Sequence, residues 1–237
     1  MTMTRRLADI FACGFSFALI NSGHDVITTP ITFSREISRV VYGHCARCHR
    51  PGGQAFSLMT YAEARPWAAA IKEEVLERRM PPWGAVKGFG EFQDDQGLTL
   101  EQIELIADWV EGGAPEGEPK LLPGAPAFPE DRTNRLRSGI PVEGALTLKT
   151  GITLAGIQPR KVLDSGSVVV TAIVTATRLD GSIEPLLWLY NYNPRFPHTY
   201  WYKAELHLEA GTRIEVSPPG AATVALFTKA PRASAHR

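Results

Sequence analysis

Hydrophobic residues recur at the spacing of an α-helix in the first half of the chain. In FSREISRVVYGHC, at 33–45, one helical face carries Phe33, Ile37, Val40, Val41 and His44. TYAE at 60–63 and TLEQ at 99–102 have the form of capping boxes, in which two side chains three residues apart bond each other's backbone N–H groups. The pattern predicts helices that begin there and end near Arg79 and at Gly112. The expected core residues of the last helix are Leu105, Ile106, Trp109 and Val110.

The last third of the chain changes to the alternation that is typical of β-strands. In SVVVTAIVTATRLDGS, at 167–182, one strand face carries Val168, Val170, Ala172, Val174 and Ala176. Asp180 and Gly181 favour a hairpin turn, after which 183–192 returns as a second strand. TYWYKAELHLEAGTRIEV and AATVALFTKA supply further strands around a glycine turn.

These patterns predict an α + β chain of two domains. A small all-α domain is expected at 33–117 and an all-β sandwich at 145–230, which is a natural division for 237 residues. The segment between them, 118–144, is rich in proline and glycine and shows no periodicity. We therefore expect it to be a linker.

The charge balance indicates which classes of partner are expected, and the N-terminal segment indicates the cellular location. Lysine plus arginine and aspartate plus glutamate number 25 each, so the net charge is zero. This argues against nucleic acid as a partner, because binding to phosphates needs a basic surface. Arg5 and Arg6 precede an apolar run at 11–20, as in a signal peptide, and the run is too short to span a bilayer. We expect residues 1–23 to direct export to the periplasm or beyond, with an uncleaved membrane anchor as the alternative.

The stretch YGHCARCHRPGG, at 42–53, holds two of the three cysteines. A zinc site usually draws four ligands from two separated pairs, and no second pair is present. A thioredoxin-like redox pair needs a strand–turn–helix setting, whereas here a helix precedes Cys45 and RPGG follows His49.

Covalent haem attachment explains all three residues. Two thiols two residues apart can each add to one of the two vinyl groups of a porphyrin, and the next residue then directs its imidazole at the iron. We predict that Cys45 and Cys48 anchor one covalent haem c and that His49 is an axial ligand of its iron.

The second axial ligand should be a soft donor on a loop over the opposite face of the haem. In LERRMPPWG, Met80 is followed by Pro81 and Pro82, which end the preceding helix and restrict the loop. His/Met ligation raises the reduction potential of a c-type haem. We predict Met80 as this ligand, with Met59 as the rival. His44 would have to reach around the ring.

The similarity extends beyond this motif. CARCHRPGGQAFSLMTYAEARPWAAAIKEEVLERRMPPW, followed by LTLEQIELIADWVEGGAPEG, resembles the c-type cytochrome domain with a CxxCHxPGG…MPPW pattern. That domain occurs in exported bacterial proteins, often fused to domains related to copper type II ascorbate-dependent monooxygenases. The resemblance implies a cytochrome c-like first domain with thioether anchors at Cys45 and Cys48, a proximal ligand at His49 and a distal ligand at Met80.

The segment LLWLYNYNPRFPHTYWYKAELHLEAGTRIEV resembles part of the last domain of those monooxygenases, but the copper ligands differ. When LDG at 179–181 is used as the anchor, the His-x-His pair of the family falls at Ala176 and Arg178. No methionine follows Met80. His198 and His207 are not spaced as a pair, and we interpret both as surface histidines.

The leading hypothesis is an exported mono-haem cytochrome that transfers single electrons, with a β-sandwich that docks a redox partner protein or a membrane redox complex. We therefore favour an electron-transfer protein over an enzyme and leave the question of an enzymatic activity open. The alternative is a haem-containing oxidoreductase related to the copper monooxygenases, in which the haem feeds a site in the β-domain. A third hypothesis is a binding module whose haem is structural.

Overall fold

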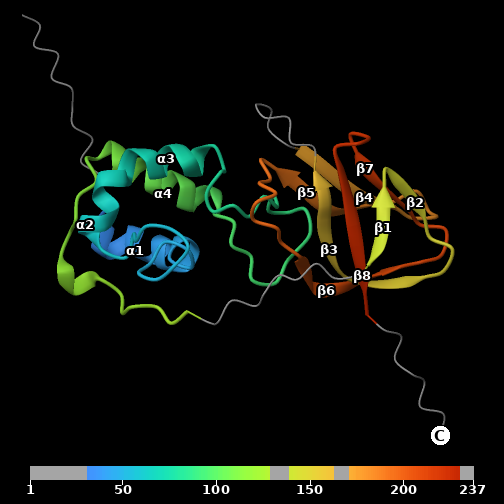
Figure 1. Cartoon of the computed structure of the whole chain (residues 1–237), viewed down its shortest axis with the longest axis horizontal. Coiled ribbons are helices and arrows are strands. Elements are labelled where there is room, and N and C mark those ends of the chain that lie inside the picture. Colours follow the sequence, from blue (N-terminus) through green and yellow to red (C-terminus); the bar gives the residue numbers. More distant parts are fainter. Residues whose placement is uncertain (1–30, 129–138, 163–170, 230–237) are drawn as a thin grey trace, which may run out of the picture.

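The computed structural model describes residues 31–128, 139–162 and 171–229, in which short helices precede antiparallel sheets (Figure 1). The first helical stretch combines a π-helical turn (Phe33–Ile37), α1 (Ser38–Val40) and a second π-helical turn (Val41–Cys45). The next runs from α2 (Tyr61–Ala64) through a 3₁₀ turn (Arg65–Trp67) into α3 (Ala68–Leu76). α4 spans Leu100–Glu111, and a 3₁₀ turn follows at Pro119–Leu121.

The strands of the described residues form two four-stranded sheets in which all neighbours are antiparallel. One sheet has the order β1-β8-β3-β6, made of Ile140–Glu143, Ala222–Thr228, Ile152–Val162 and Tyr200–Leu208. The other has the order β2-β7-β4-β5, made of Ala145–Thr147, Arg213–Ser217, Thr171–Thr177 and Ile183–Tyr190. We call these two sheets the two-sheet unit. A shared core of buried side chains from both sheets, such as Leu154, Ile157, Val174 and Leu187, stabilises it.

The helices enclose a second, smaller core. Phe33 and Trp109 are almost fully buried there, and their ring centroids lie 6.2 Å apart. The segment after α4 returns to the start of the chain, because the backbone N–H of Phe33 and the indole N–H of Trp109 both donate to the carbonyl oxygen of Pro115, each at 3.0 Å. The start of the helical stretch that ends at Cys45 is thereby joined to α4 through Pro115.

Residues 84–93 join the helical part to the two-sheet unit. The N–H of Tyr190 in β5 donates to the carbonyl oxygen of Gly84 at 2.8 Å, and the N–H of Lys203 in β6 donates to that of Glu91 at 2.8 Å. Since β5 and β6 are the outermost strands of the two sheets, this segment covers one open edge of each. In Figure 1 it runs between the helices at one end and the sheets at the other.

The predicted fold class is therefore wrong. We expected an α + β chain with a small all-α, cytochrome c-like domain, whereas the described chain is mostly β and its helices are short and separated by irregular segments. The physical reason lies in residues 83–92, within the range expected to be all-α. Trp83, Ala85 and Phe92 are buried in the core of the two-sheet unit, so this part of the chain does not close a helical domain of its own.

Several local features agree with the sequence. Both capping boxes are present, with Thr60 and Glu63 before α2 and Thr99 and Gln102 before α4. Gly181 has a φ of 82° in the hairpin turn between β4 and β5. The helix expected to reach Arg79 ends instead at Leu76, where the chain turns toward Met80.

One segment differs from the expectation, and other expectations fall outside the described residues. The segment interpreted as a linker contains the whole of β1, which pairs with β8. The expected signal peptide, like Val168 and Val170 of the predicted strand, lies outside the described residues. None of the helices in the described ranges is long and apolar enough to cross a membrane.

Candidate functional site

Cys45 lies at the end of the first helical stretch, where the chain turns back on itself. The backbone N–H groups of Cys48 and His49 both donate to the carbonyl oxygen of Cys45, at 3.1 and 2.9 Å. This turn places the backbone of all three residues at one end of the helix. Both cysteines are half-buried, and neither forms a disulfide.

The RPGG loop folds back against this turn because its glycines permit it. Gly52 has a φ of 72°, in the left-handed region that side chains disfavour. A Cβ atom on Gly53 would lie 2.3 Å from the carbonyl oxygen of Cys48, which is closer than any real contact. The loop then passes beside His49, whose carbonyl oxygen accepts the N–H of Leu58 at 3.2 Å.

The imidazole of His49 is oriented by the same loop. Its Nδ1 atom lies 3.0 Å from the carbonyl oxygen of Phe56. A carbonyl oxygen can only accept, so Nδ1 carries the proton and Nε2 keeps its lone pair. An imidazole held in this way is arranged as a metal ligand, because the bond at the second nitrogen fixes both the tautomer and the ring plane.

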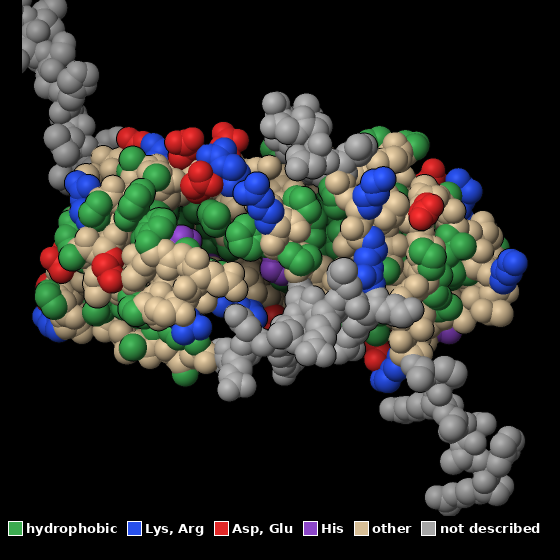
Figure 2. Space-filling model, in the orientation of Figure 1, with side chains coloured by type: hydrophobic (Ala, Val, Ile, Leu, Met, Phe, Trp, Pro, Cys, Tyr) green, Lys and Arg blue, Asp and Glu red, His purple; other side chains and the backbone are tan. Residues whose placement is uncertain are grey.

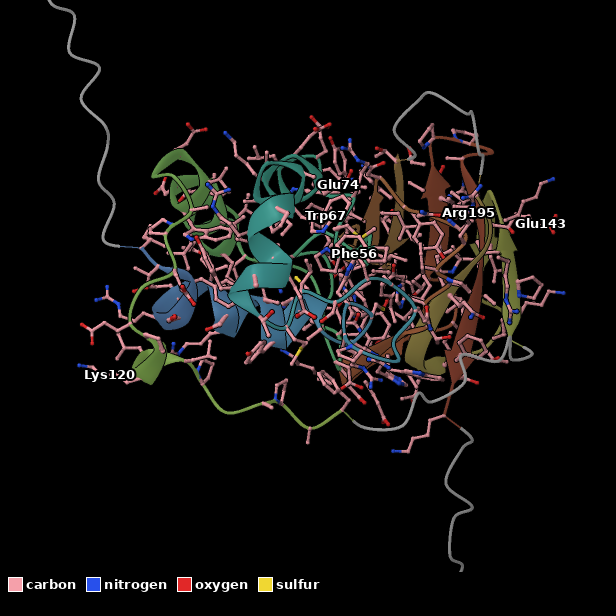
Figure 3. All side chains as sticks on the ribbon, turned by 60° about the vertical axis from the view of Figure 1, so that its left-hand side comes forward. Phe56, Trp67, Glu74, Lys120, Glu143 and Arg195 are labelled. Carbon is pink, nitrogen blue, oxygen red and sulfur yellow. The ribbon has the colours of Figure 1, made fainter. Side chains whose placement is uncertain are left out.

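An exposed aromatic pair lies beside this imidazole. The rings of Phe56 and Trp67 stack with their centroids 4.5 Å apart, yet 49% and 46% of these side chains remain exposed. The Phe56 ring also meets the His49 ring edge to face, at 4.8 Å. Figure 3 shows Phe56 and Trp67 next to each other, and Figure 2 shows hydrophobic side chains around a hollow on the helical part. Large apolar side chains that are exposed together often mark a binding surface for a ligand, a cofactor or another protein.

The thiol of Cys45 packs against the helical core. Burial, with Cys48 beside it, raises the pKa of Cys45 to about 12. A thiol with such a pKa stays protonated at neutral pH, whereas the reactive cysteine of a redox pair has a lowered pKa. The local environment therefore does not favour a thiol–disulfide exchange site.

Met80 lies after α3, on the chain that leads into the two-sheet unit. Its N–H donates to the carbonyl oxygen of Glu74 at 3.2 Å, and its side chain is half-buried. It lines a small pocket of about 30 Å³, open to solvent, together with Val75, Trp83, Leu98 and Ile103. Cys45, Cys48 and His49 are not among the residues that line this pocket.

The two rivals for the second ligand position differ in their surroundings. Both ring nitrogens of His44 are within hydrogen-bond distance of the protein, Nδ1 at 3.0 Å from the Gln96 carbonyl oxygen and Nε2 at 3.1 Å from Nε2 of Gln102. His44 therefore serves to join the helix to α4. Met59 is half-buried, and its carbonyl oxygen accepts the hydroxyl of Tyr42 at 2.9 Å.

The positions that would correspond to a copper pair have structural roles. Ala176 is fully buried in the core of the two-sheet unit. Arg178 forms an ion pair with Glu184 and donates to the carbonyl oxygen of His207. Within the described residues, no group of three or more histidine, cysteine, aspartate or glutamate side chains is arranged to hold a metal ion.

His198 lies next to the segment that follows Met80, which we did not predict. We interpreted it as a surface histidine, but it is half-buried and its Nε2 lies 2.9 Å from the carbonyl oxygen of Pro82. His207, on β6, is exposed as expected. The signal that could have drawn attention to His198 is the aromatic sequence HTYWY, because Tyr200 contacts the same segment.

Comparison with protein-family models, with curated proteins and with solved structures finds no match to this chain. The resemblance to c-type cytochrome domains is therefore carried by the residues quoted above. The residues present do fit a covalent haem: two neighbouring thiols, an imidazole with a free Nε2 and an apolar aromatic surface beside it.

Proposed function

We propose that this chain is an exported mono-haem c-type cytochrome that transfers single electrons. The observation that carries the proposal is the hydrogen bond between Nδ1 of His49 and the carbonyl oxygen of Phe56, directly after the turn that holds Cys45 and Cys48. This bond leaves Nε2 available as a ligand on the residue that follows a pair of thiols.

Each residue of the site has a stated part in this function. Cys45 and Cys48 would hold the haem covalently: each S–H group would add across a vinyl C=C bond, so that one C–S bond forms and the hydrogen goes to the other vinyl carbon. His49 and Met80 would supply the donor atoms for the iron, and Phe56 and Trp67 would lie against an apolar part of the ring. When bound, the haem supplies an iron that can gain and lose one electron.

The two-sheet unit would serve as the surface on which a redox protein or a membrane redox complex docks. The proposal of export rests on the N-terminal segment, with Arg5 and Arg6 before an apolar run. The absence of net charge favours no particular class of redox partner, but it does not favour nucleic acid.

The test is optical absorption of the full chain after expression with a cytochrome c maturation system, in the oxidised and the reduced state. We expect haem that resists acetone extraction and a weak far-red methionine–iron band. The band should be lost in Met80→Ala, and covalent haem should be lost when Cys45 and Cys48 are both replaced by alanine. His44→Ala is the matched control and should keep both signals. A colourless protein, or one that binds zinc through the two thiols, would refute the proposal.

The alternative, a haem-containing oxidoreductase with a second site in the two-sheet unit, draws support from one observation. The segment after Met80 is hydrogen-bonded to β5, so a site there would be directly connected to the haem region. Stoichiometric copper in the purified protein, together with haem-dependent oxidation of a substrate, would favour this alternative over a simple electron carrier.

A further inference from the structure

We infer that the two-sheet unit positions the distal ligand, because His198, Asn191 and Tyr200 hold the backbone of the Met80 loop. We use this name for residues 77–84. The inference rests on the proposed function, since it assigns these three side chains as positioning residues for a haem ligand.

Donors from the two-sheet unit reach four carbonyl oxygens of the Met80 loop. Three come from side chains: Nδ2 of Asn191 donates to Glu77 at 2.8 Å, Nε2 of His198 to Pro82 at 2.9 Å, and the hydroxyl of Tyr200 to Trp83. The fourth is the backbone N–H of Tyr190, which donates to Gly84 at 2.8 Å. Met80 thus lies between two points at which the loop is attached to the sheets.

The Met80 loop depends on these donors because its own sequence offers few backbone N–H groups that could bond to its carbonyl oxygens. Pro81 and Pro82 have no backbone N–H, so neither can bond to another part of the loop through its nitrogen. Arg78 has a φ of 55°, a left-handed conformation that is unfavourable for a residue with a side chain. The carbonyl oxygens that follow the end of α3 therefore find their partners outside the helix.

The aromatic side chains around the loop add a second attachment. Trp83 is 5% exposed and belongs to the core of the two-sheet unit. Its ring lies 5.0 Å from that of His198 and 4.9 Å from that of Tyr200, measured between centroids. Because Trp83 is only three residues from Met80, a displacement of β6 or of the preceding loop would move the ligand.

His198 is the most informative position to change. Its carbonyl partner can only accept, so Nε2 carries a proton in this contact. Loss of one such bond weakens the closed form of the loop by about fivefold in its equilibrium with an open form. An open loop exposes the iron to an external ligand, which makes imidazole a suitable probe.

The experiment measures the far-red methionine–iron band and the affinity for imidazole of the matured full chain. We expect His198→Ala and Asn191→Ala each to raise the imidazole affinity by about fivefold and to weaken the band, with a larger effect in the double variant. His198→Gln, which keeps an N–H donor, should restore much of the band. Covalent haem content should be unchanged in all of these variants.

Two controls separate positioning from general loosening of the fold. His207→Ala changes an exposed histidine of β6 and should have no effect. Leu208→Ala removes a fully buried side chain of the same strand and should lower the melting temperature without a change in imidazole affinity. If the double variant binds imidazole like the wild type, or if Leu208→Ala has the same effect as His198→Ala, the inference is wrong.

The same measurements distinguish failure of the inference from failure of the proposed function. A wild-type protein without covalent haem would refute the proposed function. A wild-type protein with covalent haem but without the methionine band would overturn Met80 as the ligand, and the positioning role with it. A wild-type protein with both signals, and variants identical to it, would overturn the positioning role alone.

Discussion

The Nε2 atom of Gln102 lies 3.1 Å from Nε2 of His44, and this contact fixes the tautomer of the histidine. Oε1 of Gln102 accepts the backbone N–H of Thr99 at 2.9 Å in the capping box of α4, so its amide nitrogen points at His44. Nε2 of His44 must then accept, and Nδ1 donates to the carbonyl oxygen of Gln96 at 3.0 Å. Gln102 and the carbonyl group of Gln96 thus occupy both ring nitrogens of His44, so this histidine has no nitrogen left for a metal ion.

Replacement of Gln102 should therefore lower the stability of the fold by more than the loss of a helix cap alone. We expect Gln102→Ala to lower the free energy of unfolding by about 1–2 kcal/mol, because both the reciprocal bond of the capping box and the contact with His44 are lost. Urea denaturation measures this change. Glu104→Ala, at an exposed position of the same helix, is the control, and an equal loss there would contradict the role assigned to Gln102.

The RPGG loop provides a second test, through two glycines with different surroundings. Gly53→Ala would place a Cβ atom against the carbonyl oxygen of Cys48, and we expect a loss of about 1–3 kcal/mol of stability together with reduced haem incorporation. Gly43→Ala meets no atom within 4 Å and lies in a helical turn, so it should be neutral or stabilising by up to about 1 kcal/mol. The free energy of unfolding and the haem content are measured for both variants. Equal effects of the two substitutions would show that the close approach at Gly53 is unimportant.

The features that the sequence predicted well are local ones. The Thr60–Glu63 and Thr99–Gln102 capping boxes and the Asp180–Gly181 turn depend on side chains within three or four residues of each other, and they are found where expected. The turn that joins Cys45, Cys48 and His49 is also local, but the role of these three residues stays a prediction.

The features that the sequence did not reveal depend on distant contacts. Residues 84–93 contain three glycines and two charged residues among few β-formers, so no periodicity marks them as partners of β5 and β6. Their position is decided by bonds to residues about a hundred positions later, such as that between the N–H of Val86 and the carbonyl oxygen of Trp188 at 2.9 Å. The expectation of a separate all-α domain was wrong because these distant contacts are not visible in the sequence. His198 was interpreted as a surface residue for the same reason.

The aromatic pair beside His49 predicts a difference between the haem-free and the haem-loaded protein. Without haem, Trp67→Ser should cost less than about 1 kcal/mol of stability, because nearly half of the side chain is already exposed. With haem, the loss should be larger, since the indole would then be covered. Thermal unfolding of both forms tests this, with Leu100→Ser as a control at an exposed apolar position of α4. An equal loss in the two forms would argue against Trp67 as part of the haem surface.

His198 makes the free energy of unfolding depend on pH, and the sign of this dependence follows from the surroundings of its imidazole. Burial holds the pKa of His198 below its ordinary value of 6.5, and the charge of Arg47 acts in the same direction. As the pH falls below 6.5, the unfolded chain takes up a proton that the folded chain resists, so the unfolded state gains stability. The free energy of unfolding should thus fall with decreasing pH, by at most about 1.4 kcal/mol per pH unit for this group, until the folded imidazole is protonated as well.

The measurement is denaturant unfolding between pH 7.5 and 5 for the wild type and for His198→Gln, which cannot titrate in this range. The variant should lack this part of the slope, whereas His207→Gln, at an exposed position, should retain it. Hydrogen bonds with Thr32 and Thr60 help to hold the pKa values of Glu36 and Glu63 below the ordinary 4.5. The contribution of these two carboxylates to stability is therefore lost only at lower pH and does not interfere with the measurement. An unchanged slope in His198→Gln would mean that His198 is as accessible to protons in the folded chain as in the unfolded one.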